Sequence, residues 1–304
     1  MACSAGHLVD GWRLGEPWQV GALTLFPVLG GGPGLELVPF ARALAQGAEA
    51  RELPEGASVN DILVDNPTGA KLLLLDGEAV EGAQQNRVFD GSMVVPPRSR
   101  VKVPVCCVEQ GRWDGRAHHR PFRSAGHVAH PELRSTMAVL RSVSTGRTDQ
   151  DGVWSHVASR VRDSGTSSST VALDDVYRSR EDELDALVEG VPSCPGQRGM
   201  LVLEGDALVA LDWVASEEAW ADLHPRFVRG YAMDALERPN AARPASRAQA
   251  ERHLAHLRSL PLDEGHPRGA ARSLGATHTG GPRPVHVSAL AVDGHLAHFA
   301  ALAA

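Results

Sequence analysis

Two carboxylates in this sequence are candidates for general acid–base catalysis. Glu78 begins a run rich in amide side chains, and Glu109 ends a run in which apolar and polar residues alternate. Acid–base chemistry requires a proton carrier within hydrogen-bond reach of the substrate, with a pKa that partial burial moves toward the working pH. We therefore expect Glu109 and Glu78 to be catalytic. The structural alternative is a solvated hairpin position for Glu78 and a salt bridge from Glu109 to Arg112 or Arg87.

Guanidinium, amide and indole groups lie close to both carboxylates in the sequence. Guanidinium forks bind phosphate or carboxylate oxygens, and side-chain amides bind neutral polar edges. Together they predict a phosphorylated or nucleotide-like ligand, and a network that pins the loops is the structural alternative. An indole can stack on a base or fill a core. The residues expected to bind substrate are Arg87, Arg112, Asn86, Gln85, Trp113 and Gln110.

Cysteine and histidine residues offer weaker signals. Cys107 is a candidate nucleophile, but no histidine lies in the same segment, and a buried thiol is usually inert. The pairs His253/His256 and His295/His298 have a spacing that could bind a metal, yet no set of carboxylates or cysteines accompanies them. We expect no metal site, and the sequence requires no cofactor.

The candidate residues lie among apolar runs typical of β-strands. Residues 72–75 are apolar at every position, and the Asp76-Gly77 dipeptide that follows predicts a hairpin turn. Residues 100–110 alternate, so Cys107 should point inward and Glu109 should lie at the rim of the core. Residues 114–131 are polar, contain four histidines and predict a long loop.

The second half of the chain alternates between helical and strand patterns. Helices are predicted over residues 132–143 and 149–162, and a further helix is expected to bend or restart at Pro225. Apolar runs around Gly-Asp and Asp-Gly dipeptides predict hairpins at 199–214 and 285–302.

Strands and helices thus occur in blocks, which predicts an α+β fold. We expect an antiparallel β-sandwich-like N-terminal half, followed by a mixed α+β half with β-hairpins and several helices. The corresponding domains are residues 1–130, β-rich and carrying the candidate site, and residues 131–304, packed closely on the first.

Composition excludes several classes of protein. The 30 basic and 37 acidic residues give a net charge of -7 without a block of Lys or Arg, so we expect no nucleic-acid partner. No run approaches the ~18 apolar residues of a membrane span, so we expect no membrane partner. The four cysteines contain no C-x-x-C motif and fit free thiols in a reducing compartment. We therefore expect a cytoplasmic protein, and the oligomeric state is open.

Three segments carry a resemblance to a known family. They are Leu-Leu-Leu-Asp-Gly-Glu-Ala-Val-Glu-Gly-Ala-Gln-Gln-Asn-Arg at 73–87, Met-Val-Val-Pro-Pro at 93–97 and Val-Pro-Val-Cys-Cys-Val-Glu-Gln-Gly-Arg-Trp at 103–113. They resemble the signature of the ARG and rhodanese-phosphatase-superfamily-associated protein family, in which ARG stands for ADP-ribosylglycohydrolase. The chain departs from the signature at Cys106, where a small polar residue is expected, and at Gln84, where a basic residue is common.

The resemblance implies a role in NAD or ADP-ribose metabolism. We therefore expect an enzyme that processes an ADP-ribose or NAD-derived nucleotide metabolite by hydrolysis, with a small nucleotide-like molecule as its partner. The alternative is a non-catalytic nucleotide-binding or interaction module of the same family. The surroundings of Glu109 distinguish the two, because an open pocket beside it favours catalysis and a closed pair with Arg112 favours a scaffold.

Overall fold

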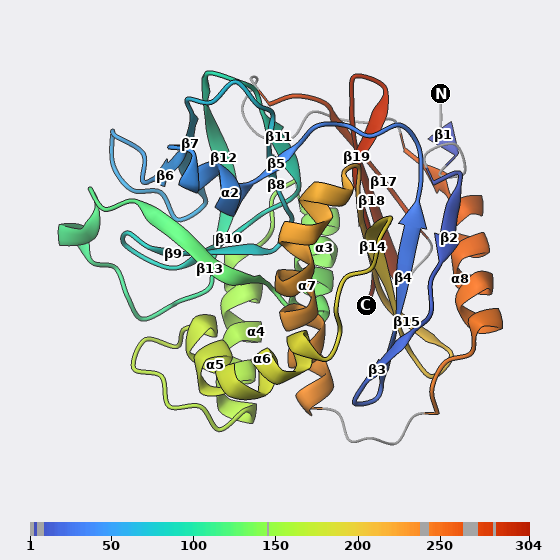
Figure 1. Ribbon diagram of the computed structural model, residues 1–304. Coiled ribbons are helices and arrows are strands. Elements are labelled where there is room, and N and C mark those ends of the chain that lie inside the picture. Colours follow the sequence, from blue (N-terminus) through green and yellow to red (C-terminus); the bar gives the residue numbers. More distant parts are fainter. Residues whose placement is uncertain (1–2, 5–8, 145, 238–242, 264–272, 282–283) are drawn as a thin grey trace.

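A large sheet and a small barrel form the two β-structures of this protein, with helices packed between them (Figure 1). The computed structural model describes residues 3–4, 9–144, 146–237, 243–263, 273–281 and 284–304. The α+β class predicted from the sequence is confirmed. No helix in these ranges is long and apolar enough to cross a membrane.

The large sheet has ten antiparallel strands in the described part of the chain. In order across the sheet they are β1 (Cys3–Ser4), β16 (Pro261–Leu262), β17 (Ala276–Gly280), β18 (Val285–Val292), β19 (His295–Ala303), β15 (Ala207–Val214), β14 (Gln197–Glu204), β4 (Leu23–Gly30) and β2 (Trp12–Leu14), while β3 (Trp18–Val20) also pairs with β4. Both predicted hairpins are present, as β14–β15 and β18–β19. Because β4 pairs with β14, strands from both sides of the expected boundary at residue 130 share one sheet.

The second β-structure is a closed barrel with a three-stranded sheet beside it. The barrel contains β10 (Arg87–Phe89), β12 (Ser99–Cys107), β7 (Asp61–Asn66), β6 (Glu49–Arg51), β13 (Phe122–Val128) and β9 (Glu78–Gly82). The small sheet contains β11 (Met93–Val95), β8 (Leu72–Leu74) and β5 (Val38–Pro39). The N-terminal antiparallel strands therefore close on themselves instead of stacking as a sandwich. An irregularity in β13, where Gly126 has a φ of 85°, bends the strand as closure requires.

The alternation predicted for residues 100–110 is present in β12. Val101, Val103 and Val105 are buried in the hydrophobic core of the barrel, together with Phe89 of β10. Full burial of each such side chain stabilises the fold by about 1.5–3 kcal/mol relative to exposure. Cys107 is likewise fully buried, as predicted.

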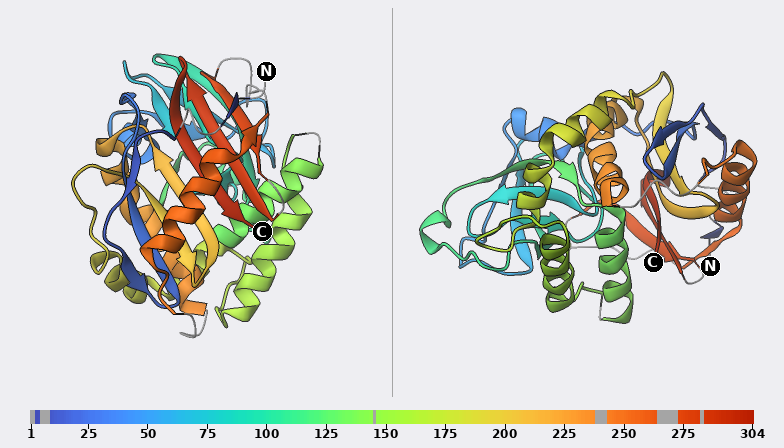
Figure 2. Two further views of the ribbon diagram at one scale, coloured as in Figure 1. Left: turned by 90° about the vertical axis from the view of Figure 1, so that its right-hand side faces the viewer. Right: turned by 90° about the horizontal axis from the view of Figure 1, so that it is seen from below.

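The helices fill the space between the two β-structures and flank them. They are α2 (Phe40–Ala45), α3 (Pro131–Val143), α4 (Gln150–Asp163), α5 (Leu173–Ser179), α6 (Glu181–Glu189), α7 (Glu217–Glu237) and α8 (Arg247–Ser259), with a 3-10 turn η1 at Gly115–Ala117. Helix α7 packs against both β13 and β14. Helix α8 lies across the outer face of the large sheet (Figure 2).

The predicted restart at Pro225 and two other local predictions are corrected by the structure. Helix α7 continues through Pro225, and Trp220 and Phe227 on either side of it stack at 5.4 Å. The predicted loop at 114–131 contains β13. Asp76-Gly77 makes no hairpin, since β8 and β9 belong to different sheets, and a Cβ on Gly77 would lie only 2.7 Å from Arg134 of α3.

Candidate functional site

Glu109 forms a closed network just after the end of β12. Its carboxylate accepts hydrogen bonds from Arg112 Nε at 2.9 Å, from the Asn86 backbone N–H at 3.1 Å and from Thr170 Oγ1 at 2.8 Å. Arg112 Nη2 also lies 2.7 Å from the carboxylate. Glu109 is 4% exposed and lines none of the cavities described below. These contacts use the carboxylate for structure, which is the arrangement that favours a scaffold.

The network continues through Asn86 to Asp174. Arg112 Nη2 donates to Asn86 Oδ1 at 2.9 Å, and Asn86 Nδ2 donates to Asp174 Oδ2 at 2.7 Å. Gln85 Nε2 reaches the backbone oxygen of Gln110 at 3.5 Å. The amides and the guanidinium predicted to bind substrate therefore position the first turn of α5.

The backbone joins the same two segments. Gly111 N–H donates to the Thr170 carbonyl at 2.7 Å, and Leu173 N–H donates to the Val108 carbonyl at 2.9 Å. A Cβ on Gly111 would lie 2.8 Å from Thr170 Cα, so only glycine permits this approach. Val171 has a φ of 53°, which is strained for a β-branched residue.

Gly111→Ala is therefore expected to destabilise the protein by about 1–3 kcal/mol, because the methyl group forces the two backbones apart. Gly115→Ala is a matched control, since nothing lies within 4 Å of its added Cβ, and it should change stability by less than about 0.5 kcal/mol. Urea denaturation of both variants measures the difference. Equal stabilities would mean that the contact between residues 111 and 170 is not tight.

A polar cavity of about 240 Å³ lies beside Asp174, between the barrel and α5, α6 and α7. Strands β9 and β13 contribute one side of it and the three helices the other. Its lining residues are Glu81, Arg123, Ala125, His127, Asp174, Tyr177, Arg178, Glu181 and Arg229.

Two titratable groups on the cavity wall have shifted pKa values. Burial raises the pKa of Asp174 to about 6, against the opposing hydrogen bond from Asn86. Burial lowers the pKa of His127 to about 3, so this imidazole is neutral at physiological pH. The His127 ring stacks on Tyr177 at 3.6 Å, and its Nε2 lies 3.8 Å from Asp174 Oδ1.

Three guanidinium groups line the same cavity, and each has a carboxylate partner. Arg123 Nε binds Glu81 at 2.8 Å, while Arg178 pairs with Asp175 and Arg229 pairs with Asp185. The Arg123 side chain is 79% exposed and the Arg178 side chain 57%. Exposed pairs of this kind contribute little to stability, so a phosphate can replace the carboxylate at small cost.

A second buried cluster surrounds Arg87 at the end of the barrel. Arg87 is fully buried, lies 3.3 Å from Glu52 and donates to the Val59 carbonyl and to Cys107 Sγ. Burial raises the pKa of Cys107 to about 11. The thiol is therefore protonated at neutral pH, which disfavours a nucleophilic role. Trp113 is 49% exposed, with its ring centroid 5.7 Å from the Arg87 guanidinium carbon.

Glu78 takes no part in the hydrogen-bond network around Glu109 among the described residues. It is fully buried at the start of β9, and neither carboxylate oxygen has a hydrogen-bond partner among the described residues. Burial raises its pKa to about 7, and Arg226 only partly offsets that effect. The carboxyl group ionises less readily in the folded protein than in the unfolded chain. The fold therefore loses stability as the pH rises.

Glu78→Gln is expected to increase stability at alkaline pH. Because its native pKa is raised, the contribution of Glu78 to stability is fully present below the unfolded pKa of about 4.3 and is lost as the pH rises through about 7. The advantage of the variant should grow by about 2–3 kcal/mol between about pH 5 and about pH 8. Denaturant titrations of both proteins at both pH values measure this difference. Asp174 also titrates in this range, but it is present in both proteins, so its effect cancels. A pH-independent difference would show that Glu78 titrates normally.

None of the residues predicted to bind substrate lines the cavity beside Asp174, and the residues that line it were not predicted. Glu109, Arg112, Asn86, Gln85 and Gln110 come together as predicted. Cys107 and Trp113 instead contact Arg87, which pairs with Glu52. Asp174, His127 and Tyr177 were not singled out, and the acidic pair at 174–175 opening a short helix was the available signal.

The fold and the polar cavity define an α+β protein whose candidate site lies between a barrel and a helical layer. The model of one protein family, the ARG and Rhodanese-Phosphatase-superfamily-associated Protein domain, matches residues 11–302. The chain belongs to this family, as the motifs at 73–113 suggested. No curated protein and no solved structure shows significant similarity to the chain.

Proposed function

We propose that this protein is a cytoplasmic enzyme that hydrolyses an ADP-ribose or NAD-derived nucleotide metabolite in the cavity beside Asp174. The observation that carries the proposal is a pair of polar atoms, Asp174 Oδ1 and His127 Nε2, that belong to two residues lining the cavity. Both are buried, and neither has a hydrogen-bond partner among the described residues. Such orphaned atoms are costly and rare in folded proteins. A hydroxyl group or water molecule held between them would satisfy both.

Asp174 is suited to act as the general base. With a pKa of about 6 it is largely ionised at neutral pH, yet it is basic enough to accept a proton. In the proposed step the carboxylate takes a proton from water, and the water oxygen bonds to the electrophilic carbon or phosphorus of the substrate. The leaving group departs with the bonding electron pair. Neutral His127 holds the water or a substrate hydroxyl by a hydrogen bond.

The charged groups around the cavity indicate the class of substrate. Guanidinium groups of Arg123, Arg178 and Arg229 suit phosphate oxygens, and the carboxylate of Glu81 suits the hydroxyls of a ribose. The cavity volume of about 240 Å³ fits a sugar-phosphate portion better than a whole dinucleotide. Free thiols at Cys106, Cys107 and Cys194 are consistent with a reducing compartment. The family description, which associates these proteins with ARG, agrees with this class.

The second candidate is a non-catalytic nucleotide-binding or interaction module. One observation favours it, which is that Glu109 and Arg112 of the family motif are engaged in a closed contact with each other. Binding without turnover would then occur in the same cavity. Turnover and binding therefore have to be measured separately.

Liquid chromatography–mass spectrometry of NAD, ADP-ribose, phosphorylated ADP-ribose and cyclic ADP-ribose tests the proposal. Each compound is incubated with the protein, with and without divalent metal, and thermal stabilisation by each compound is recorded in parallel. Conversion of any compound by wild type supports the enzyme. Stabilisation without conversion supports the binding module, and the absence of both overturns the ADP-ribose assignment.

A further inference from the structure

A separate cluster of metal-ligating side chains lies where β13 leads into α3 and faces α4. It consists of His130, the residue before α3, Glu132 in the first turn of α3, and His156 in the middle of α4. One ligand atom from each residue lies within 4.8 Å of the other two. This is the one such group of three in the part of the chain that the structure describes. Neither histidine belongs to the pairs considered from the sequence.

We propose that His130, Glu132 and His156 bind one divalent transition-metal ion of the Zn²⁺ or Co²⁺ type. The two imidazole groups present Nε2 to each other at 3.1 Å, with their rings inclined by 26°. Two nitrogens bound to one tetrahedral Zn²⁺ lie about 3.3 Å apart, because each Zn–N bond is about 2.0–2.1 Å long. The two nitrogens are thus already spaced for a shared ion.

Glu132 can complete the set with little rearrangement. Its side chain is 54% exposed and its contact with Arg160 Nη1 is 3.4 Å long, so rotation toward the two imidazole groups gives up only a long, solvent-accessible ion pair. Two imidazoles and one carboxylate suit a borderline metal ion, and three protein ligands leave a coordination position open.

Two acidic side chains lie at the cluster and share one arginine. Arg160 of α4 lies 3.4 Å from the Glu132 carboxylate and 2.9 Å from Asp234 of α7, so two carboxylates face one guanidinium.

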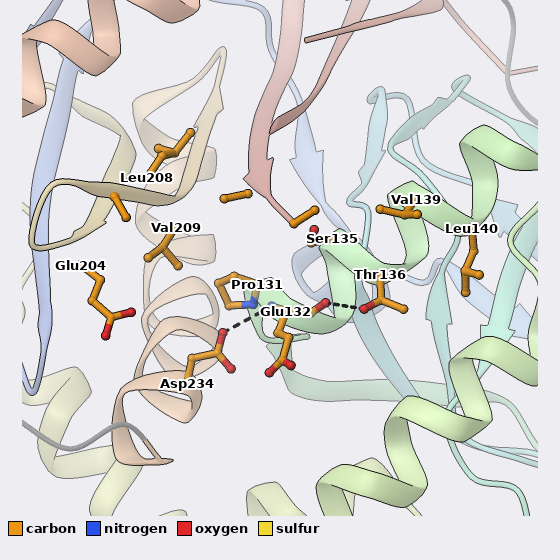
Figure 3. A pocket seen from close by; sticks show the side chains of 13 residues that line it. Pro131, Glu132, Ser135, Thr136, Val139, Leu140, Glu204, Leu208, Val209 and Asp234 are labelled. Atoms are coloured by element: carbon orange, nitrogen blue, oxygen red, sulfur yellow. Dashed lines mark hydrogen bonds between the residues drawn. The ribbon is translucent and has the colours of Figure 1, made fainter. Parts of the chain in front are cut away.

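The cluster adjoins a cavity that is distinct from the one beside Asp174. Glu132 and Asp234 line this cavity of about 520 Å³, together with apolar side chains that include Val139, Leu140 and Leu208. Figure 3 shows Glu132 and Asp234 close together on one side of it, with Leu208 and Val209 on another. Because Glu132 is the cluster residue that lines this cavity, a ligand with a metal-binding group and an apolar body would reach the ion from the Glu132 side.

Co²⁺ titration of the chelator-treated full-length protein tests the site. Visible absorption bands should appear on binding and reach saturation at one equivalent, and Zn²⁺ should displace them. His156→Ala should weaken binding by at least about 100-fold, which exceeds the effect of losing an outer-shell partner, and Glu132→Gln should weaken it less. Zn²⁺ should also raise the Tm of wild type and leave that of His156→Ala unchanged.

His253→Ala on α8 is the matched control, because His253 Nε2 lies 2.9 Å from the Asp206 carbonyl and outside the cluster. This variant should bind Co²⁺ as wild type does. Circular dichroism confirms that each variant is folded. Wild type that binds no more tightly than His156→Ala would overturn the proposal. Asp174→Asn should retain metal binding, so failure of this site and failure of the hydrolase proposal are distinguishable.

Discussion

Asp174→Asn is expected to lower the turnover number of the proposed hydrolase by about 10²–10⁴, the usual contribution of a general base. The amide is nearly the same size as the carboxyl group, and its oxygen can still accept the hydrogen bond from Asn86. The cavity should therefore keep its shape and the KM should change little. Steady-state kinetics on whichever compound wild type converts measures both parameters.

Asp175→Asn is the matched control for this prediction. The neighbouring carboxylate is 23% exposed and pairs with Arg178, so it lies next to the cavity without lining it. Its variant should keep most of the turnover. Asp174→Asn should also remain folded, with a Tm no lower than wild type above about pH 6, because it removes a desolvated carboxylate. Full activity in Asp174→Asn would exclude Asp174 as the base.

Asp212→Asn is expected to destabilise the fold by about 3–5 kcal/mol, because it leaves the guanidinium of Arg134 buried without a counter-charge. The two side chains are at most 1% exposed and lie 2.6 Å apart, between α3 and β15. The Tyr231 hydroxyl adds a hydrogen bond to Asp212 at 2.7 Å. Burial alone would raise the pKa of Asp212, but Arg134 outweighs it and holds the pKa below the ordinary value.

The pH dependence of this pair has a defined sign. Since the native pKa is depressed, the stabilisation is present above the unfolded pKa of about 3.9 and is lost as the pH falls below it. Urea denaturation of wild type and Asp212→Asn should therefore converge in acid. A double variant, Arg134→Met with Asp212→Leu, removes both charges and should recover most of the stability. A double variant as unstable as the single one would show that hydrogen bonding, not charge, dominates.

Periodic patterns gave most of the local structure from sequence alone. The alternation in β12, the apolar stripes of α3 and α4, and the hairpins β14–β15 and β18–β19 were all predictable, because each depends on residues close in the chain. The capping box at Ser246 and Gln249 is also present at the start of α8. These features follow from local side-chain spacing.

Long-range pairing was not predictable. Asp76-Gly77 has the composition of a hairpin turn, but Arg134 and Arg141 of α3 hold this dipeptide between two sheets. The cavity depends on Asp174, which the network from Glu109 through Asn86 brings against His127. His127 and Asp174 are 47 positions apart in the chain (174 minus 127), so no local sequence pattern encodes their contact. The roles of Glu109 and Glu78 as catalytic residues stay predictions.

The strand order of the large sheet constrains how the chain folds during synthesis. Strand β4 ends at Gly30, whereas its partner β14 begins only at Gln197. The apolar residues of β4 must therefore stay without their neighbour β14 while the barrel and five helices, α2 to α6, leave the ribosome. Contacts over such separations slow folding and expose strand edges. Ribosome-bound chains stopped before residue 197 should thus retain a protected barrel and a β4 open to proteolysis.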